Sequence, residues 1–133
     1  MCFSATADLV GGVILAAIGL DAARHVHQRR DHLALAALPL LLAAHQIDEA
    51  FVWWALQGHV PAAVGQVAVW IYLLFAFVVL PPYVQLSVLA LEAPGPRRRV
   101  ILAFVALGAV VSTVFLVAML DGRQRHDWSI AAA

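Results

Sequence analysis

The chain has 133 residues, of which 64% are hydrophobic and only 12% are charged, and its mean hydropathy is +0.91. A soluble globular domain is about 45–50% apolar and about 25% charged, so this composition excludes an ordinary water-soluble domain. Eight arginines balance eight acidic residues and there is no lysine, so the sequence offers no broad basic surface for binding nucleic acid.

The first helix is expected to begin within Ser4–Asp8, where a hydroxyl or a carboxylate can accept hydrogen bonds from the amides of the first turn. The apolar stretch that follows has no convincing cleavage site, so we expect this helix to be retained. The single cysteine, Cys2, excludes an intrachain disulfide and supplies no cysteine-rich metal site.

Four apolar segments are long enough to cross a bilayer, which takes roughly 20 helical residues. They cover residues 9–24, 33–56, 62–91 and 100–120. We therefore expect an all-α integral membrane protein in which about four transmembrane helices form one bundle within residues 1–121, followed by a polar tail at residues 122–133. In the third segment Pro81 and Pro82 remove two backbone donors and crowd the preceding turn, so the third helix is predicted to kink there.

Arginines are concentrated in two of the three connecting loops. RHVHQRRDH at residues 24–32 and APGPRRRV at residues 93–100 carry six of the eight arginines, whereas QGHVPAAVGQ at residues 57–66 carries none. Arginine and lysine in short loops favour the cytoplasmic side of a membrane. We therefore predict a multi-pass protein of the cell (inner) membrane with both termini outside.

The second segment contains a polar cluster, HQIDEAFVWW at residues 45–54. His45 and Glu49 are four residues apart and share a helix face, Asp48 lies beside them, and Trp53 is one turn beyond Glu49. A carboxylate at the centre of a bilayer costs about 2.5–3.5 kcal/mol on the insertion scale. Both acids must therefore be neutralised, paired or exposed to an internal aqueous cavity.

Hydroxyl groups on the other helices are candidate partners for this cluster. Helix three is expected to run inward and helix four outward, which brings Tyr72, Ser112 and Thr113 to about the depth of Glu49. Tyr72 and Thr113 are therefore predicted to support the cluster from helices three and four.

Four interpretations of the cluster remain open. It is a hydrogen-bond network that only fixes helix packing, a proton or ion relay, a metal or haem site at His45 and Glu49, or the centre of a membrane enzyme with Glu49 as general base on a lipid-like substrate. The metal signal is weak because a catalytic zinc site typically needs three protein ligands, although His45 alone suffices as an axial haem ligand. The other histidines lie in predicted loops or tails.

Several motifs in a fixed order resemble a family of uncharacterised bacterial membrane proteins, the domain-of-unknown-function 6629 family. They are MCFSATA at the N-terminus, HQIDEAFVWW, FVVLPPYVQLSVLALE and the following RRR. The resemblance implies that Cys2, Gln46, Glu49 and Trp53 occupy positions of the family's pattern, and it shifts the emphasis from His45 to Gln46 and Glu49. It carries no established activity. Members are usually longer, so either this chain is a shortened member or a missing half carries needed groups.

We therefore expect a small binding or proton-linked membrane module centred on Glu49, with no cofactor predicted. The alternative is a structural or assembly subunit that forms a homo-oligomer or joins another membrane subunit, and a membrane enzyme is the third possibility. The predicted binding or relay residues are Glu49, His45, Asp48 and Gln46, and the predicted supporting residues are Tyr72, Thr113 and Trp53.

Overall fold

The computed structural model describes the backbone of residues 4–26, 28 and 30–131, and the side chains of these residues except 30, 31 and 123–131. The described part of the chain is helical throughout, apart from short connections. The elements are α1 (Ala5–Val26), α2 (Arg30–Ala36), α3 (Leu38–Leu56), α4 (Ala62–Leu74), the π-helix η1 (Phe75–Val79), α5 (Leu80–Leu91) and α6 (Pro96–Ala131).

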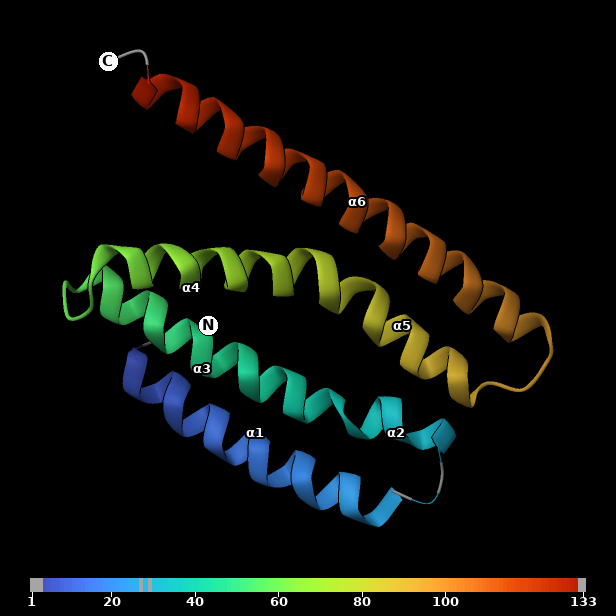
Figure 1. Cartoon of the computed structure of the whole chain (residues 1–133). Helices are drawn as coiled ribbons and strands as arrows, with labels where there is room; N and C mark the ends of the chain where they lie inside the picture. Colours follow the sequence, from blue (N-terminus) through green and yellow to red (C-terminus); the bar gives the residue numbers. More distant parts are fainter. Residues whose placement is uncertain (1–3, 27, 29, 132–133) are drawn as a thin grey trace.

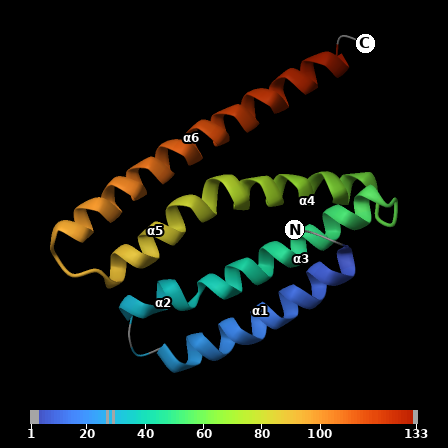
Figure 2. The same ribbon diagram turned by 180° about the vertical axis from the view of Figure 1, so that it is seen from behind.

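The helices form a layered bundle whose last helix opens away from the others. α1 packs antiparallel to α3, α3 packs on α4, and α2 packs on α5 (Figure 1). α6 packs on α5 and η1, and its C-terminal half stands apart from α4 in both views (Figures 1 and 2). The ends of α1 and α5 lie at the same end of the bundle as the starts of α2 and α6, so the two arginine-rich connections share one side.

The prediction of four long apolar helical segments is confirmed for the described residues. Each is long and apolar enough to cross a membrane, and together they cover Ala5–Val26, His32–Leu56, Ala62–Leu91 and Pro96–Gly122. Each observed segment covers at least the residues that were predicted for it. The helix of the fourth segment continues to Ala131, through most of the region expected to be a polar tail.

Small and polar side chains are buried, and large apolar side chains are exposed. The buried apolar side chains among the described residues are all alanines, at positions 5, 43, 50 and 68, and the buried polar ones are Asp8, Glu49, Ser87 and Ser112. Leu56 is 75% exposed and Val13 63% exposed. Helix interfaces of small residues with apolar groups outside are typical of membrane bundles, because lipid tails solvate leucine and valine as well as a protein core does.

One face of α1 brings its backbone close to α3. The buried residues of α1 are Ala5, Asp8, Gly12 and Gly19, whose spacings of three, four and seven follow the seam of a coiled coil. A Cβ atom at Gly12 would lie 2.9 Å from the Ile47 side chain, and one at Gly19 would lie 2.6 Å from that of Leu40. These glycines therefore allow the close approach, and they place Asp8 on the same interface.

The second apolar segment is divided in two, where a single helix over residues 33–56 was predicted. α2 ends at Ala36, and α3 begins at Leu38 with Pro39 in its first turn. Proline has no N–H to donate to a carbonyl one turn earlier, which explains the interruption. The Tyr83 hydroxyl of α5 donates a hydrogen bond to the Ala34 carbonyl at 2.7 Å, so α5 supports α2 at the end that borders the interruption.

Replacing Tyr83 with phenylalanine is expected to lower the free energy of unfolding by about 1 kcal/mol, because a hydrogen bond contributes about 0.5–1.5 kcal/mol net. The change is measured by thermal or detergent-induced unfolding. Thr113→Val is the matched control, since the Thr113 hydroxyl donates within its own helix, to the Ala109 carbonyl at 2.8 Å. Equal losses in the two variants would contradict a specific role for the contact between α5 and α2.

The predicted irregularity of the third segment begins before the two prolines. The helix widens to π-helical geometry over Phe75–Val79 and resumes as α5 at Leu80, with the prolines in its first turn. The Leu80 N–H bonds to the Phe75 carbonyl, an i to i+5 pairing that adapts the helix to the donors missing at Pro81 and Pro82. The segment bends between α4 and α5, as Figure 1 shows.

Candidate functional site

Two acidic side chains are buried on helices that pack on each other, one on α1 and one on α3. Asp8 of α1 is 4% exposed and Glu49 of α3 is 6% exposed. The two groups are close enough to interact electrostatically. Within the described part of the chain, no hydrogen-bond donor reaches Oδ2 of Asp8. The structure thus buries two acids within electrostatic reach of each other between α1 and α3.

Side chains of α3 supply the polar neighbours of this pair. Gln46 donates a long hydrogen bond of 3.4 Å from Nε2 to Oε2 of Glu49. Trp53, one turn beyond Glu49, hydrogen-bonds the Asp8 carboxyl, and its indole N–H is necessarily the donor. Gln46, Glu49 and Trp53 therefore lie toward α1, and Asp8 joins them as a fourth member.

His45 lies on the opposite side of the cluster, toward α4. Its ring stacks on Tyr72 at 4.6 Å between centroids and on Phe75 at 5.6 Å, with interplanar angles of 23° and 15°. Its Nδ1 atom is buried and has no hydrogen-bond partner among the described residues. His45 is still close enough to Glu49 for an electrostatic interaction. It therefore connects the acid pair to the start of the π-helix.

Asp48 also interacts electrostatically with Glu49. Its Oδ2 atom is buried and lacks a hydrogen-bond partner in the described structure. The cluster predicted on one face of α3 therefore spreads over two faces. Gln46, Glu49 and Trp53 meet α1, whereas His45 meets α4.

The two predicted supporting hydroxyls have different positions. Tyr72 reaches the cluster through its ring contact with His45. Thr113 is exposed on α6 and donates to the Ala109 carbonyl of its own helix, so its hydrogen bond within the described part of the chain does not join it to the cluster. The reason is that α6 packs on α5 and η1 and diverges from α4. Ser112, beside it, is buried, and its Oγ has no hydrogen-bond partner among the described residues.

Asp8 is the residue that the sequence analysis missed. Ser4–Asp8 was interpreted as a capping segment, and Ser4 does cap α1, since its Oγ accepts a hydrogen bond from the Ala7 N–H at 3.2 Å. Asp8 instead lies one turn further in and is buried. The spacing of Asp8 from Ala5, Gly12 and Gly19 could have revealed its burial. These four residues lie on one face of α1, and that face packs on another helix.

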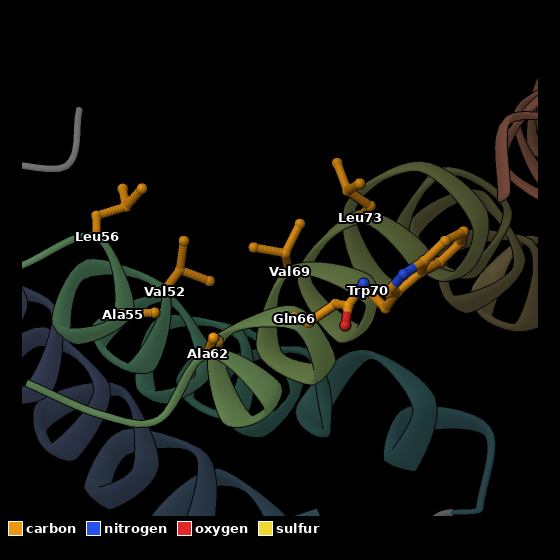
Figure 3. A pocket seen from close by; sticks show the side chains of 9 residues that line it. Val52, Ala55, Leu56, Ala62, Gln66, Val69, Trp70 and Leu73 are labelled. Atoms are coloured by element: carbon orange, nitrogen blue, oxygen red, sulfur yellow. The ribbon is translucent and has the colours of Figure 1, made fainter. Parts of the chain in front are cut away.

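A separate groove of about 480 Å³ opens between the end of α3 and the first half of α4 (Figure 3). Gln66 and Trp70 contribute its polar side-chain atoms, and the side chains of Val52, Leu56, Val69 and Leu73 point to the same side of the two helices. The complete lining is Val52, Ala55, Leu56, Ala62, Gly65, Gln66, Val69, Trp70 and Leu73. Neither acid of the pair lines it, so the groove and the acid pair are distinct features.

The cluster differs from the common metal sites. In the described ranges, no three His, Cys, Asp or Glu side chains lie close enough together to hold a metal ion. His45 and Glu49 share a helix, as predicted, but the histidine ring stacks on aromatic rings of α4 and η1. Cys2, which the resemblance placed on the family's pattern, lies outside the described residues.

Fold and site together define an all-α bundle with four helical segments of membrane-spanning length and polar groups buried between them. The chain belongs to a family of unknown function, DUF6629, whose profile matches residues 1–126. The resemblance noted from the sequence motifs is thereby confirmed, and it covers the whole cluster. Comparison with curated proteins and with solved structures gives no match.

Proposed function

We propose that the chain is a multi-pass protein of the bacterial inner membrane, and that the pair formed by Asp8 and Glu49 binds a proton within the membrane. The observation that carries this proposal is the burial of two carboxyl groups from different helices within electrostatic reach of each other. The protein would be a small proton-linked binding module centred on Glu49.

The physical reason is that two adjacent carboxylates cannot both stay charged cheaply in an apolar interface. Like charges that share a site favour retention of one proton, as in carboxylate pairs of enzymes. Each uncompensated charge also carries the insertion cost of an acid in a membrane. In this proposal, the donors from Gln46 and Trp53 stabilise the one negative charge that remains on the pair.

The groups beside the pair form a polar path across α3. His45 and Asp48 both interact electrostatically with Glu49, and both have a buried atom with no partner among the described residues. In this proposal they relay the proton between Glu49 and the side of α3 that faces α4. Intramembrane acids and histidines commonly serve as such relays in pumps and transporters.

Surface composition supports insertion in the bilayer with both termini outside. Large apolar side chains are exposed along all four long segments, as a lipid environment requires. Arg97 and Arg99 are exposed at the end that the two arginine-rich connections share, and Arg98 donates to the carbonyls of Leu89 and Glu92 at 3.1 and 3.0 Å. This end would face the cytoplasm.

Infrared spectroscopy tests the proton. In nanodiscs near neutral pH, the wild-type protein is expected to show a carbonyl band of a protonated carboxyl group that Asp8→Asn and Glu49→Gln each remove or shift. Asp21→Asn is the control, because the Asp21 side chain is 71% exposed at the other end of α1, and it should leave the band unchanged. A wild-type spectrum without the band, or a band that persists in both site variants, would refute the proposal.

A second candidate is a structural or assembly subunit, and one observation favours it. The C-terminal half of α6 stands away from α4, and its Val114 and Val117 are 62% and 60% exposed. A second copy or another membrane subunit would pack there, and the polar cluster would then only hold helices together. The two candidates predict opposite effects of Asp8→Asn on stability.

A further inference from the structure

Three consecutive arginines lie in the first turn of α6, and the structure gives the middle one a different role from its neighbours. Arg98 is half-buried, and its guanidinium group donates hydrogen bonds to the carbonyl oxygens of Leu89 and Glu92 at 3.1 and 3.0 Å. Leu89 lies in the last turn of α5, and Glu92 is the residue at which that helix ends. Arg98 therefore joins the end of α5 to the start of α6.

The two flanking arginines, Arg97 and Arg99, are exposed. In the described part of the chain, no hydrogen bond or ion pair joins either of them to another residue. Successive residues of a helix are turned by about 100° from one another. Because Arg98 faces α5, its two neighbours leave α6 on opposite sides of that contact. Each side of the junction therefore presents one exposed guanidinium group.

The stability of α6 does not explain these arginines. Its first turn contains no acidic residue, and a cation is unfavourable there because the helix dipole is positive at this end. Residues 24–32 and 93–100, whose connections share one end of the bundle (Figures 1 and 2), contain six arginines and one acid, Asp31. Glu92 forms no ion pair with an arginine among the described residues. This end therefore attracts anions from outside the chain.

The depth of the arginines along α6 indicates which anions are near. The fourth apolar segment, Pro96–Gly122, begins with them. Val100 directly follows Arg99 and is 57% exposed, and Phe104, one turn further, is 54% exposed. When these apolar side chains contact lipid tails, Arg97 and Arg99 lie at the level of the headgroups. The phosphate groups of lipids are the anions that occur at this level.

We infer that Arg97 and Arg99 form a surface that binds anionic phospholipid, with each guanidinium group binding the phosphodiester of one headgroup. The inference rests on the insertion in a bilayer that belongs to the proposed function, and it does not use the acid pair. A guanidinium group can donate two parallel N–H bonds to phosphate oxygens. A headgroup with a net negative charge fits best, because a zwitterionic headgroup carries a cation of its own that competes for the phosphate.

Native mass spectrometry of the detergent-purified full chain tests this surface, with phosphatidylglycerol as the probe and phosphatidylcholine of the same acyl chains as the neutral lipid. The wild-type protein is expected to retain one phosphatidylglycerol per exposed arginine at a concentration at which phosphatidylcholine is not retained. Arg97→Gln and Arg99→Gln should each weaken one of these sites about fivefold, the usual contribution of a basic residue at an anionic lipid surface. The double variant should show this loss at both sites.

The chain offers two matched controls. Arg98→Gln removes the arginine that is bound to α5, so it should lower stability and leave the retention of phosphatidylglycerol unchanged. Arg123→Gln combined with Arg125→Gln removes the same charge as the double variant at the other end of α6, about 40 Å away at the helical rise. This pair should also retain the lipid. Circular dichroism checks the helical content of each variant.

Equal retention of phosphatidylcholine, or retention of phosphatidylglycerol by the Arg97 and Arg99 double variant, would overturn the lipid surface. So would an equal loss in the Arg123 and Arg125 pair, which would show an effect of net charge alone. Displacement of the lipid by inorganic phosphate at the same concentration would indicate a site for free anions instead. An infrared band of the acid pair without lipid selectivity would leave the proton site standing. Failure to reconstitute in phosphatidylcholine nanodiscs would refute insertion, and both proposals with it.

Discussion

Gly65→Ala is expected to lower the free energy of unfolding by about 2–3 kcal/mol, the typical penalty for forcing an extra group into a packed interface. A Cβ atom at Gly65 would collide with the Cβ atom of Ala55, so α4 must move away from α3. Ala68, one turn further along α4, is buried in the same contact layer. Unfolding in detergent, followed by circular dichroism, measures the loss.

The chain offers a matched control for this substitution. Gly122 lies in α6, and a Cβ atom there meets nothing within 4 Å. Both substitutions gain roughly 0.5–1 kcal/mol of helix preference, so Gly122→Ala is expected to be neutral or slightly stabilising. Similar stabilities for the two variants would contradict the close approach of α3 and α4. Because the same approach brings His45 onto Tyr72, Gly65→Ala should also disturb that stacked pair.

Asp8→Asn is expected to raise the free energy of unfolding by about 1–2 kcal/mol, since an amide in a membrane interface avoids much of the cost of a buried acid. Asparagine keeps the shape of the side chain and an oxygen that accepts the Trp53 N–H, so the existing hydrogen bond survives. Glu49→Gln should act in the same direction because either change removes one of two neighbouring acids. Detergent-induced unfolding in matched micelles gives the values.

The sign of this effect separates the two proposed functions. If the acid pair binds a proton, its two neighbouring acids lower the free energy of unfolding, as many functional sites do. Removal of one acid then stabilises the fold. If the cluster is only a packing network, the same substitutions weaken it and stability falls. Asp21→Asn, at the exposed end of α1, should change little in either case. A fall in both site variants would favour the assembly subunit.

Much of the fold was predictable because hydrophobic length is a local property. The four apolar segments follow from the sequence, and the structure contains all four in the described residues. The irregularity near Pro81 was also predictable, because a proline always lacks its donor. Its extension back to Phe75 was not, since the choice between a kink and a π-helix depends on what packs against the segment.

The candidate site was predictable only within one helix. Helical periodicity predicted that His45, Asp48, Glu49 and Trp53 are neighbours, because residues three and four apart on one helix lie close together. The family resemblance added Gln46. Thr113 was expected at the cluster from its depth alone, and it lies elsewhere because depth does not say which way a helix leans. α6 leans away from α4.

Sequence alone predicted an all-α chain with four apolar helical segments, because hydrophobic length and helical periodicity are local properties, and the order of its motifs identified the DUF6629 family. Only the tertiary structure decided that Asp8 meets Glu49 and that His45 turns to Tyr72 instead. The physical reason is that contacts between helices depend on where small residues such as Gly12 and Gly65 let two backbones approach each other. The periodicity of one helix does not indicate which other helix packs against it.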